Sequence, residues 1–280
     1  MSRRREYARR LEALNEIAGI MSAMKALSTM EIRRLRDYLA CQQRMVASIE
    51  RCAAEFIVWH SGFADFDTDG SDLCVLVGSE QGFCGDYNES VRNWLRNPPV
   101  DSELPHHRIV LGQRLAARLD GAEAPVAVLP GASVADELPA VLQSLSTLLR
   151  EWLEAKAGAG LSILYHCDAN GCLRLRHLLP LRDLPVPPAP IPFASELNLP
   201  PADFLSTLST HYLYAVLNEV LYSALMAENR QRLAHMESAL HKLEEDQERL
   251  RLAHNAQRQE EITEEIEIIQ LSVGMLAEEN

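Results

Sequence analysis

The first residues whose types and spacing could do chemistry form the decapeptide SEQGFCGDYN, residues 79 to 88, which follows the apolar run DLCVLVG. Cys84 lies just before a predicted helix, and a helix N-terminus can lower a thiol pKa enough to make a nucleophile. A glycine-containing loop between a strand and a helix can instead present backbone N–H groups to a phosphate. The third interpretation is a structural turn.

The sequence around Cys84 favours the structural turn. The Lys and the Ser or Thr of a P-loop are missing, and so is the Gly-x-Gly-x-x-Gly spacing of a dinucleotide site. Glu80 and Asp86 are acidic and would oppose a thiolate, and the histidines at 60, 106, 107, 166 and 177 could approach only through the fold. We therefore predict that residues 79 to 88 form a structural turn.

A second cluster, Cys167, Cys172 and His177, has spacings that could suggest zinc. A closed zinc site needs four ligands, and the paired C-x-x-C spacing is missing. The dipeptide Asn170-Gly171 is a strong two-residue hairpin turn, so these residues are better explained as parts of a hairpin. We therefore expect no metal, no bound cofactor and no catalytic residue.

Charge and composition exclude other classes. The net charge of −13 disfavours nucleic acid and anionic lipid. Five arginines near the N-terminus, at 3, 4, 5, 9 and 10, are explained as a solvated helix start because no aromatic residues interleave with them. Six scattered cysteines and the lack of a secretory signal predict a reducing compartment, and no window offers the roughly 20 apolar residues of a membrane span.

The element at the start of the chain is predicted to be one long helix. Between Arg3 and Trp59 there is no proline and a single glycine, Gly19. Alternating steps of three and four residues connect a heptad seam, which predicts a partner helix. The seam comprises Leu11, Leu14, Ala18, Met21, Lys25, Ser28, Ile32, Leu35, Leu39, Gln42, Val46, Ile49, Ala53 and Phe56. Beside it runs a second apolar stripe, Ile17, Ile20, Met24 and Leu27, which indicates a further contact surface or ordinary bundle core.

The last third of the chain mirrors the first. Residues 202 to 276 contain no proline and only Gly274, with apolar heptads from Leu233 to Leu243 and from Ile262 to Leu276. At about 1.5 Å per residue, the two helices would be on the order of 80 and 110 Å long. Such lengths favour an antiparallel coiled coil, with the middle of the chain inserted between its helices.

The middle of the chain reads as an α/β unit. Strands are predicted at 72 to 78, 107 to 112, 124 to 130 and 161 to 167, with helices between them and a hairpin strand after 171. The predicted fold class is therefore α/β: a long antiparallel coiled coil of the N- and C-terminal helices with an inserted Rossmann-like α/β domain. The predicted domains are a coiled-coil helix (1–60), an α/β domain (70–180), a proline-rich connector (181–201) and a second coiled-coil helix (202–280).

Three stretches far apart in the chain carry distinct motifs: GIMSAMKALSTMEIRRLR (19–36), SEQGFCGDYN (79–88) and NAQRQEEITEEIEII (255–269). Together they resemble the γ subunit of the F-type ATP synthases. Several residues match the family patterns: Ala23-Met24-Lys25 in the first stretch, the turn residues Ser79, Gly82, Cys84, Gly85 and Asn88 in the second, and Asn255, Arg258, Gln259, Ile262, Thr263, Glu265 and Ile269 in the third. Glu80-Gln81 and ENRQRLAHMESALHKLEED depart from them, so the chain resembles a divergent branch, and its opening is most similar to the alternate, often sodium-linked, bacterial ATPases.

The resemblance implies a central-stalk rotor that couples ion flow, of hydrogen ions or sodium, through the membrane ring to ATP synthesis or hydrolysis in the catalytic hexamer. The chain would be no enzyme on its own, only a non-catalytic CF(1)-type subunit. Its implied partners are the alpha and beta subunits, the epsilon subunit and the membrane c-ring, with no nucleic acid and no direct membrane span. It would be a peripheral protein at the cytoplasmic face of the bacterial inner membrane.

The resemblance also assigns residues to rotor–hexamer contact and coupling: Met21, Met24, Lys25, Leu27, Arg258, Gln259, Thr263, Glu265, Ile269 and Val273. The turn at 79 to 88 is structural in this family. Two other classes stay open from the residues alone. A free-standing coiled-coil adaptor would explain the heptads without the α/β insert, and a thiol enzyme would explain Cys84 without the long helices.

Overall fold

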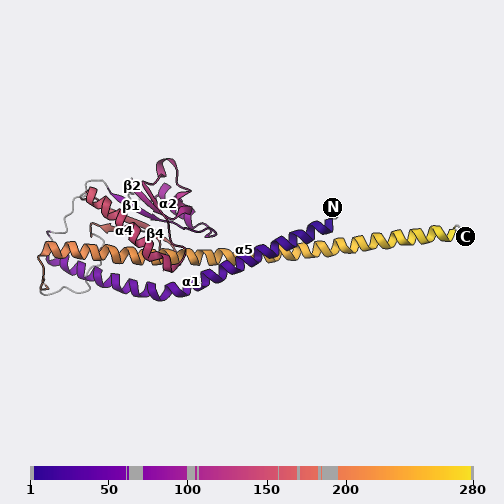
Figure 1. Cartoon of the computed structure of the whole chain (residues 1–280), viewed down its shortest axis with the longest axis horizontal. Helices are drawn as coiled ribbons and strands as arrows, with labels where there is room; N and C mark the ends of the chain where they lie inside the picture. Colours follow the sequence, from indigo (N-terminus) through magenta and orange to yellow (C-terminus); the bar gives the residue numbers. More distant parts are fainter. Residues whose placement is uncertain are drawn as a thin grey trace. The chain divides into compact units, whose positions relative to one another are not determined.

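The computed structural model describes residues 3–60, 62, 72–99, 105, 107–156, 158–168, 171–181, 184 and 195–278 (Figure 1). Helices α1 (Arg3–Trp59) and α5 (Pro201–Glu278) occupy the two ends of the sequence. The elements between them are β1 (Leu73–Val77), α2 (Tyr87–Arg96), β2 (His107–Leu111), α3 (Gln113–Ala116), η2 (Gly121–Glu123), β3 (Ala127–Leu129), η3 (Ala135–Glu137), α4 (Leu138–Ala155), β4 (Leu161–His166) and β5 (Leu173–Leu179).

The heptad seam predicted for α1 is the stripe that the structure buries. Leu35 and Phe56 on this seam are 0% and 5% exposed. Tyr38 stacks on Tyr222 of α5 with ring centroids 5.8 Å apart, and Phe56 lies 5.0 Å from Phe204. The contacting residue on α5 has a lower number where the residue on α1 has a higher one, so the two helices run antiparallel, as predicted.

The inserted domain is a five-stranded sheet in the order β3-β2-β1-β4-β5. Strands β1 to β4 are parallel, and β5 is antiparallel to β4. Central strand β1, Leu-Cys-Val-Leu-Val, is buried along its whole length, which is typical of a parallel strand covered on both faces. The predicted fold class is confirmed.

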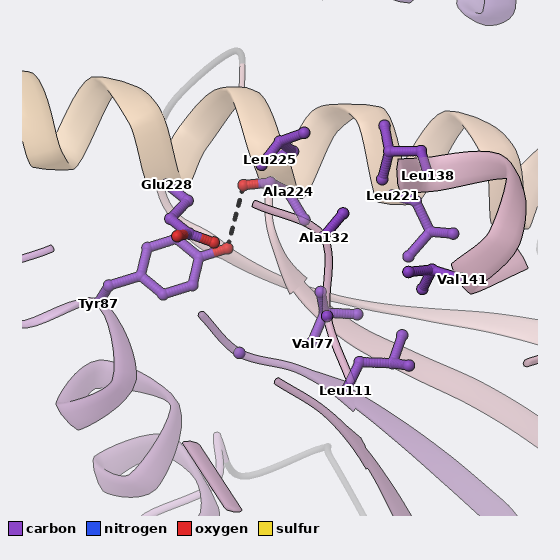
Figure 2. A pocket seen from close by; sticks show the side chains of 12 residues that line it. Val77, Tyr87, Leu111, Ala132, Leu138, Val141, Leu221, Ala224, Leu225 and Glu228 are labelled. Atoms are coloured by element: carbon purple, nitrogen blue, oxygen red, sulfur yellow. Dashed lines mark hydrogen bonds between the residues drawn. The ribbon is translucent and has the colours of Figure 1, made fainter. Parts of the chain in front are cut away.

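Different helices cover the two faces of the sheet (Figure 1). On one face, Cys74 and Leu76 of β1 pack in a cluster with Val91 and Leu95 of α2 and with Leu115 of α3. On the other face, side chains of α4 and α5 meet the ends of β1 and β2 (Figure 2). The sheet is therefore sandwiched between helices, with α5 contributing to one layer.

The chain divides into two compact units, Met1–Leu27 with Leu233–Asn280, and Ser28–Arg232. The first unit is an antiparallel coil tied by ion pairs from Arg4 to Glu261 at 3.4 Å and from Lys25 to Glu237 at 3.0 Å.

One polar pair joins the two helices of this coil, from a buried glutamine on α5 to an exposed asparagine on α1. Gln247, only 9% exposed, donates from Nε2 to Asn15 Oδ1 at 3.0 Å. A buried amide at a seam position fixes the register of a coiled coil, because a shifted alignment would leave it without its partner.

Most of the predicted proline-rich connector (181–201) falls on residues 182–183 and 185–194, outside the residues that the structure describes. The second unit contains the whole sheet together with parts of both long helices. The division of the chain into functional domains stays a prediction.

Candidate functional site

The turn at residues 79 to 88 connects β1 to α2 and is closed by its two end residues. The backbone N–H of Ser79 donates to Asn88 Oδ1 at 2.9 Å, and Asn88 Nδ2 donates to Ser79 Oγ at 2.7 Å. Both residues are buried. Satisfying these polar groups inside the fold fixes where the loop leaves the sheet and where the helix begins.

The left-handed positions of the turn are Phe83 (φ 63°) and Gly85 (φ 57°). Glycine adopts this conformation without steric cost, whereas a phenylalanine there is strained. Gly82 has room for a Cβ, whose nearest neighbour would be Arg114 Nη2 at 3.8 Å. The glycine that the backbone requires is therefore Gly85.

The turn docks onto α5 through a buried polar cluster, which we call the Cys84 cluster: Cys84, Glu228 and Arg232. Arg232 Nη2 donates to Cys84 Sγ at 3.2 Å and forms a close ion pair with Glu228, while its Nε donates to the carbonyl of Gly82 at 3.3 Å. The Cys84 thiol lies 3.7 Å from Glu228 Oε1. Next to the cluster, Tyr87 donates its hydroxyl to the carbonyl of Ala224 at 3.2 Å (Figure 2).

Burial sets the chemistry of this cluster. Burial first, then the negative charge of Glu228, raises the pKa of Cys84 to about 12. Burial also raises the pKa of Glu228 to about 7, outweighing the nearby Arg232. A thiol that stays protonated at neutral pH is a poor nucleophile, so the geometry opposes the thiol-enzyme interpretation.

Cys84 should therefore resist alkylation in the folded chain. At pH 8 we expect Cys84 to react with iodoacetamide at least about a hundred times more slowly than the exposed Cys41 of α1. The reasons are that only a small fraction of Cys84 is present as the thiolate and that its side chain is buried. Peptide mass spectrometry over a time course measures both rates. Equal rates would contradict the buried, protonated thiol.

Parallel α/β sheets usually bind ligands at the carboxyl ends of their strands. In this chain, side chains of α4 and α5 cover the carboxyl ends of β1 and β2. Here Val77 and Leu111 at the strand ends face Leu221 of α5 and Leu138 of α4, around a cavity of about 20 Å³ (Figure 2). That volume suits about one water molecule, whereas ligand pockets have roughly 300 Å³ or more. This cavity is too small for a nucleotide.

The carboxylate of Glu80 accepts hydrogen bonds from two backbone N–H groups near the turn. Its Oε2 accepts from the N–H of Gln113 at 3.0 Å and from that of Gly131 at 2.8 Å. These amides are therefore already bound by a carboxylate of the chain, which opposes the phosphate-binding interpretation of the loop.

His166, at the end of β4, is a buried neutral imidazole. Its ring stacks on Tyr87 with centroids 3.9 Å apart. Ser90 donates its hydroxyl proton to the carbonyl of Tyr87, so His166 Nε2 is the donor to Ser90 Oγ, at 2.8 Å. Burial, partly offset by Asp86, lowers the pKa of His166 to about 4.

His166 and Glu228, whose pKa values are both shifted by burial, should have opposite effects on how the stability of the fold changes with pH. The unfolded His166 binds a proton below about pH 6.5 but the folded one only below about pH 4, so its contribution falls as the pH drops between these values. For Glu228 the folded pKa is the higher one, so its contribution grows as the pH drops from about 7 to about 4.5.

Replacing His166 by Gln should separate the two effects. The difference in unfolding free energy between the native chain and His166→Gln is expected to fall by up to about 3 kcal/mol from pH 7 to pH 4, at about 1.4 kcal/mol per pKa unit. Urea unfolding of both chains at several pH values measures it. A difference that does not change with pH would contradict the depressed pKa.

The predicted coupling residues lie in the first unit, in two separate groups. Met21, Met24, Lys25 and Leu27 are on α1, at the level of Glu237, and Leu27 is 60% exposed. Arg258, Gln259, Thr263, Glu265 and Ile269 are exposed on α5, near the level of Glu261, and Thr263 Oγ1 bonds to the carbonyl of Gln259 at 2.8 Å. The groups are separated by about 30 Å of helix. Val273 lies in α5 beyond the last side chain described, and the coupling role of all ten stays a prediction.

The residues considered for zinc lie around the β4–β5 hairpin, and the described residues contain no cluster able to hold a metal ion. His177 of β5 contacts Ser162 Oγ through Nδ1 at 3.0 Å. Cys167 and Cys172 flank the hairpin turn, whose Asn170 is not among the described residues. None of the helices described in the structure has an apolar stretch long enough to cross a membrane.

Sequence reasoning missed the buried charges that hold the domain to the helices. Arg176 of β5 pairs with Glu50 of α1 at 2.6 Å and with Glu219 of α5 at 2.7 Å. Glu228 and Arg232 have the i,i+4 spacing of a helical ion pair, which the sequence does display. Nothing in the sequence indicates that any of these charges is buried.

Comparison with known proteins gives concordant findings. The family model described as ATP synthase matches residues 3–271. The ATP synthase gamma chain of Azobacteroides pseudotrichonymphae genomovar. CFP2 is 22% identical over 275 residues, covering 94% of this chain and 95% of that protein.

Solved structures share the fold. A chain of the Euglena gracilis mitochondrial ATP synthase (OSCP/F1/c-ring) has a TM-score of 0.65 at 16% identity, covering 99% of this chain and 96% of that one. A chain of the Tetrahymena thermophila mitochondrial ATP synthase central stalk and c-ring has a TM-score of 0.54 at 15% identity, covering 79% and 99%.

Proposed function

Because the chain belongs to the ATP synthase gamma-chain family, matched over residues 3–271, we propose that it is the central-stalk rotor of a rotary ATP synthase or ATPase. The observation that carries the proposal is this family match over nearly the whole chain, joined to the antiparallel coil of the two terminal helices. A free-standing adaptor would need neither the sheet nor the family's turn.

The proposed partners are the alpha and beta subunits around the coil, the epsilon subunit and the membrane c-ring. One rotor cannot contact three chemically identical beta subunits equally, so its orientation would bias each toward a different nucleotide affinity. Exposed side chains support this use of the coil, since Ile20 and Leu27 of α1 are 62% and 60% exposed. Unpaired apolar area of this kind favours a partner surface.

Rotation would couple ion flow through the ring to ATP synthesis or hydrolysis, with no active site in this chain. The ten coupling residues predicted above would supply the contacts that distinguish the beta conformations. The complex would lie at the cytoplasmic face of the bacterial inner membrane, with this subunit peripheral. The helices at 1–60 and 202–280 would form the shaft, and the domain at 70–180 its attachment to the ring side.

Co-purification tests the proposal. The chain is tagged in its native cell and isolated at low detergent, and the recovered complex is assayed for ATP hydrolysis with and without added sodium. We expect alpha and beta subunits at about three copies each per copy of this chain. Recovery of the chain alone would overturn the rotor proposal, and the ion dependence would identify the coupling ion.

A further inference from the structure

Glu228 of α5 carries a carboxyl that is almost completely buried, with 3% of the residue exposed. It forms a close ion pair with Arg232, and its Oε1 lies 3.7 Å from Cys84 Sγ. Arg232 also donates to the carbonyl of Gly82 at 3.3 Å. The turn at residues 79 to 88 is therefore attached to α5 through an ion pair that is closed off from water.

The titratable groups that face Glu228 come from α5, from the turn and from the start of α2: Arg232, Cys84, Glu80 and Tyr87. Arg232 is the single cation in this set. The other nearby acids have partners of their own, since Asp86 of the turn accepts from Gln231, and Glu31 of α1 accepts from the N–H of Ala135 at 3.2 Å. The strand ends and α4 contribute only apolar residues and glycine to the cavity beside Glu228. A charged Glu228 is thus offset by one cation.

Burial makes the charge on Glu228 unfavourable while the turn is attached. A carboxylate removed from water is destabilised, and one ion pair compensates for only part of this penalty. Burial first, opposed by Arg232, accordingly raises the pKa of Glu228 from its ordinary 4.5 to about 7. When the turn is detached, water reaches the carboxyl and its ordinary pKa returns. The attached state thus binds the proton more tightly, so a falling pH favours attachment and a rising pH weakens it.

The local structure of the turn favours its opening separately from the sheet. Between residues 81 and 86 only Cys84 is buried. Phe83, at φ 63°, has a strained left-handed backbone conformation, and its side chain is 60% exposed. Segments with few buried contacts open locally at a smaller free-energy cost than the whole fold. Cys74 in β1, by contrast, is fully buried and becomes accessible only when the sheet opens.

We propose that the turn detaches reversibly from α5 while the sheet stays folded, and that protonation of Glu228 keeps it attached. Between about pH 4.5 and pH 7, one proton passes from water to the carboxyl as the turn closes and returns to water as it opens. Detachment therefore becomes more frequent as the pH rises. Arg232 is the last α5 residue of the second unit, and Leu233 is the first α5 residue of the other. The pH-dependent attachment thus lies at the residue where α5 passes from one unit into the next.

The test compares cysteine alkylation in the native full-length chain and in Glu228→Gln, which keeps the shape of the side chain but not its charge. Iodoacetamide is applied at pH 6 and at pH 8, and peptide mass spectrometry gives the rate at Cys84. Dividing by the rate at the exposed Cys41 removes the intrinsic effect of pH on thiol reactivity. From pH 6 to pH 8 this ratio should rise about tenfold more in the native chain than in Glu228→Gln, as a change in pKa from about 7 to 4.5 on opening requires. The same rise in both chains would overturn the proposal.

Two controls make the result specific. Glu80→Gln removes another carboxyl of the turn and should keep the native pH dependence, so loss of that dependence would show that Glu228 is not the responsible acid. Cys74 reports opening of the sheet and should react more slowly than Cys84 at both pH values. Equal rates at Cys74 and Cys84 would show that the turn opens only together with the sheet, which would overturn the proposal. None of these outcomes depends on the rotor role.

Discussion

Replacing Arg176 by Ala is expected to cost about 3 to 5 kcal/mol of unfolding free energy at pH 7. The guanidinium lies between Glu50 and Glu219, and all three side chains are at most 19% exposed. Without Arg176, the carboxylates of Glu50 and Glu219 lose their shared cation in a largely buried site. Because they come from α1 and α5 while Arg176 belongs to β5, the loss loosens the sheet from both helices.

A matched control separates burial from the mere presence of an ion pair. Arg10 pairs with Glu6 at 2.7 Å, but both side chains are more than half exposed, so Arg10→Ala should cost less than about 1 kcal/mol. Urea unfolding of the full-length chain measures both variants. Equal costs for the two variants would contradict the argument.

Replacing Arg232 by Ala is the second change with a large expected effect, again about 3 to 5 kcal/mol, at pH 8. It leaves Glu228 charged and without its ion-pair partner in a site where burial already raises the pKa of that carboxyl to about 7. It also removes the donors to Cys84 Sγ and to the carbonyl of Gly82, so the turn loses its attachment to α5.

The charge on Glu228 can be tested within the same experiment. Below about pH 7 the carboxyl becomes neutral, so the deficit of Arg232→Ala should decrease as the pH falls. Adding Glu228→Gln to Arg232→Ala should restore part of the lost stability at pH 8. A double-mutant cycle from the four chains measures the coupling. If the second substitution made the chain still less stable, the unpaired charge would not be the cause.

The fold was predictable because its periodicities are simple. The seam through Leu35 and Phe56 follows a strict heptad, and β1 is an unbroken apolar run, so both elements follow from local pattern. The Asn-Gly dipeptide and the motif order likewise indicate the hairpin and the family, although the pairing of His166 with Leu173 is not the register of the predicted two-residue turn. These signals depend on residues near one another in the sequence.

The parts that escaped prediction depend on contacts between distant residues. Arg176 meets Glu50 across 126 positions, and Cys84 meets Arg232 across 148. No periodicity specifies such pairs, and charged residues are usually exposed, so burial of these ones could not be inferred. The left-handed Phe83 was also unforeseen, since glycine is the residue expected at that conformation.

The hydrogen bond between Gln247 and Asn15 has a mechanical consequence. An apolar heptad seam is nearly unchanged when one helix slides past the other by one heptad, a displacement of about 10 Å along the axis. Such a slip would cost little packing, yet it would displace whatever surface the coil presents to its surroundings. In a slipped alignment the buried amide of Gln247 would lose its partner Asn15, so this hydrogen bond favours the native register of the two helices.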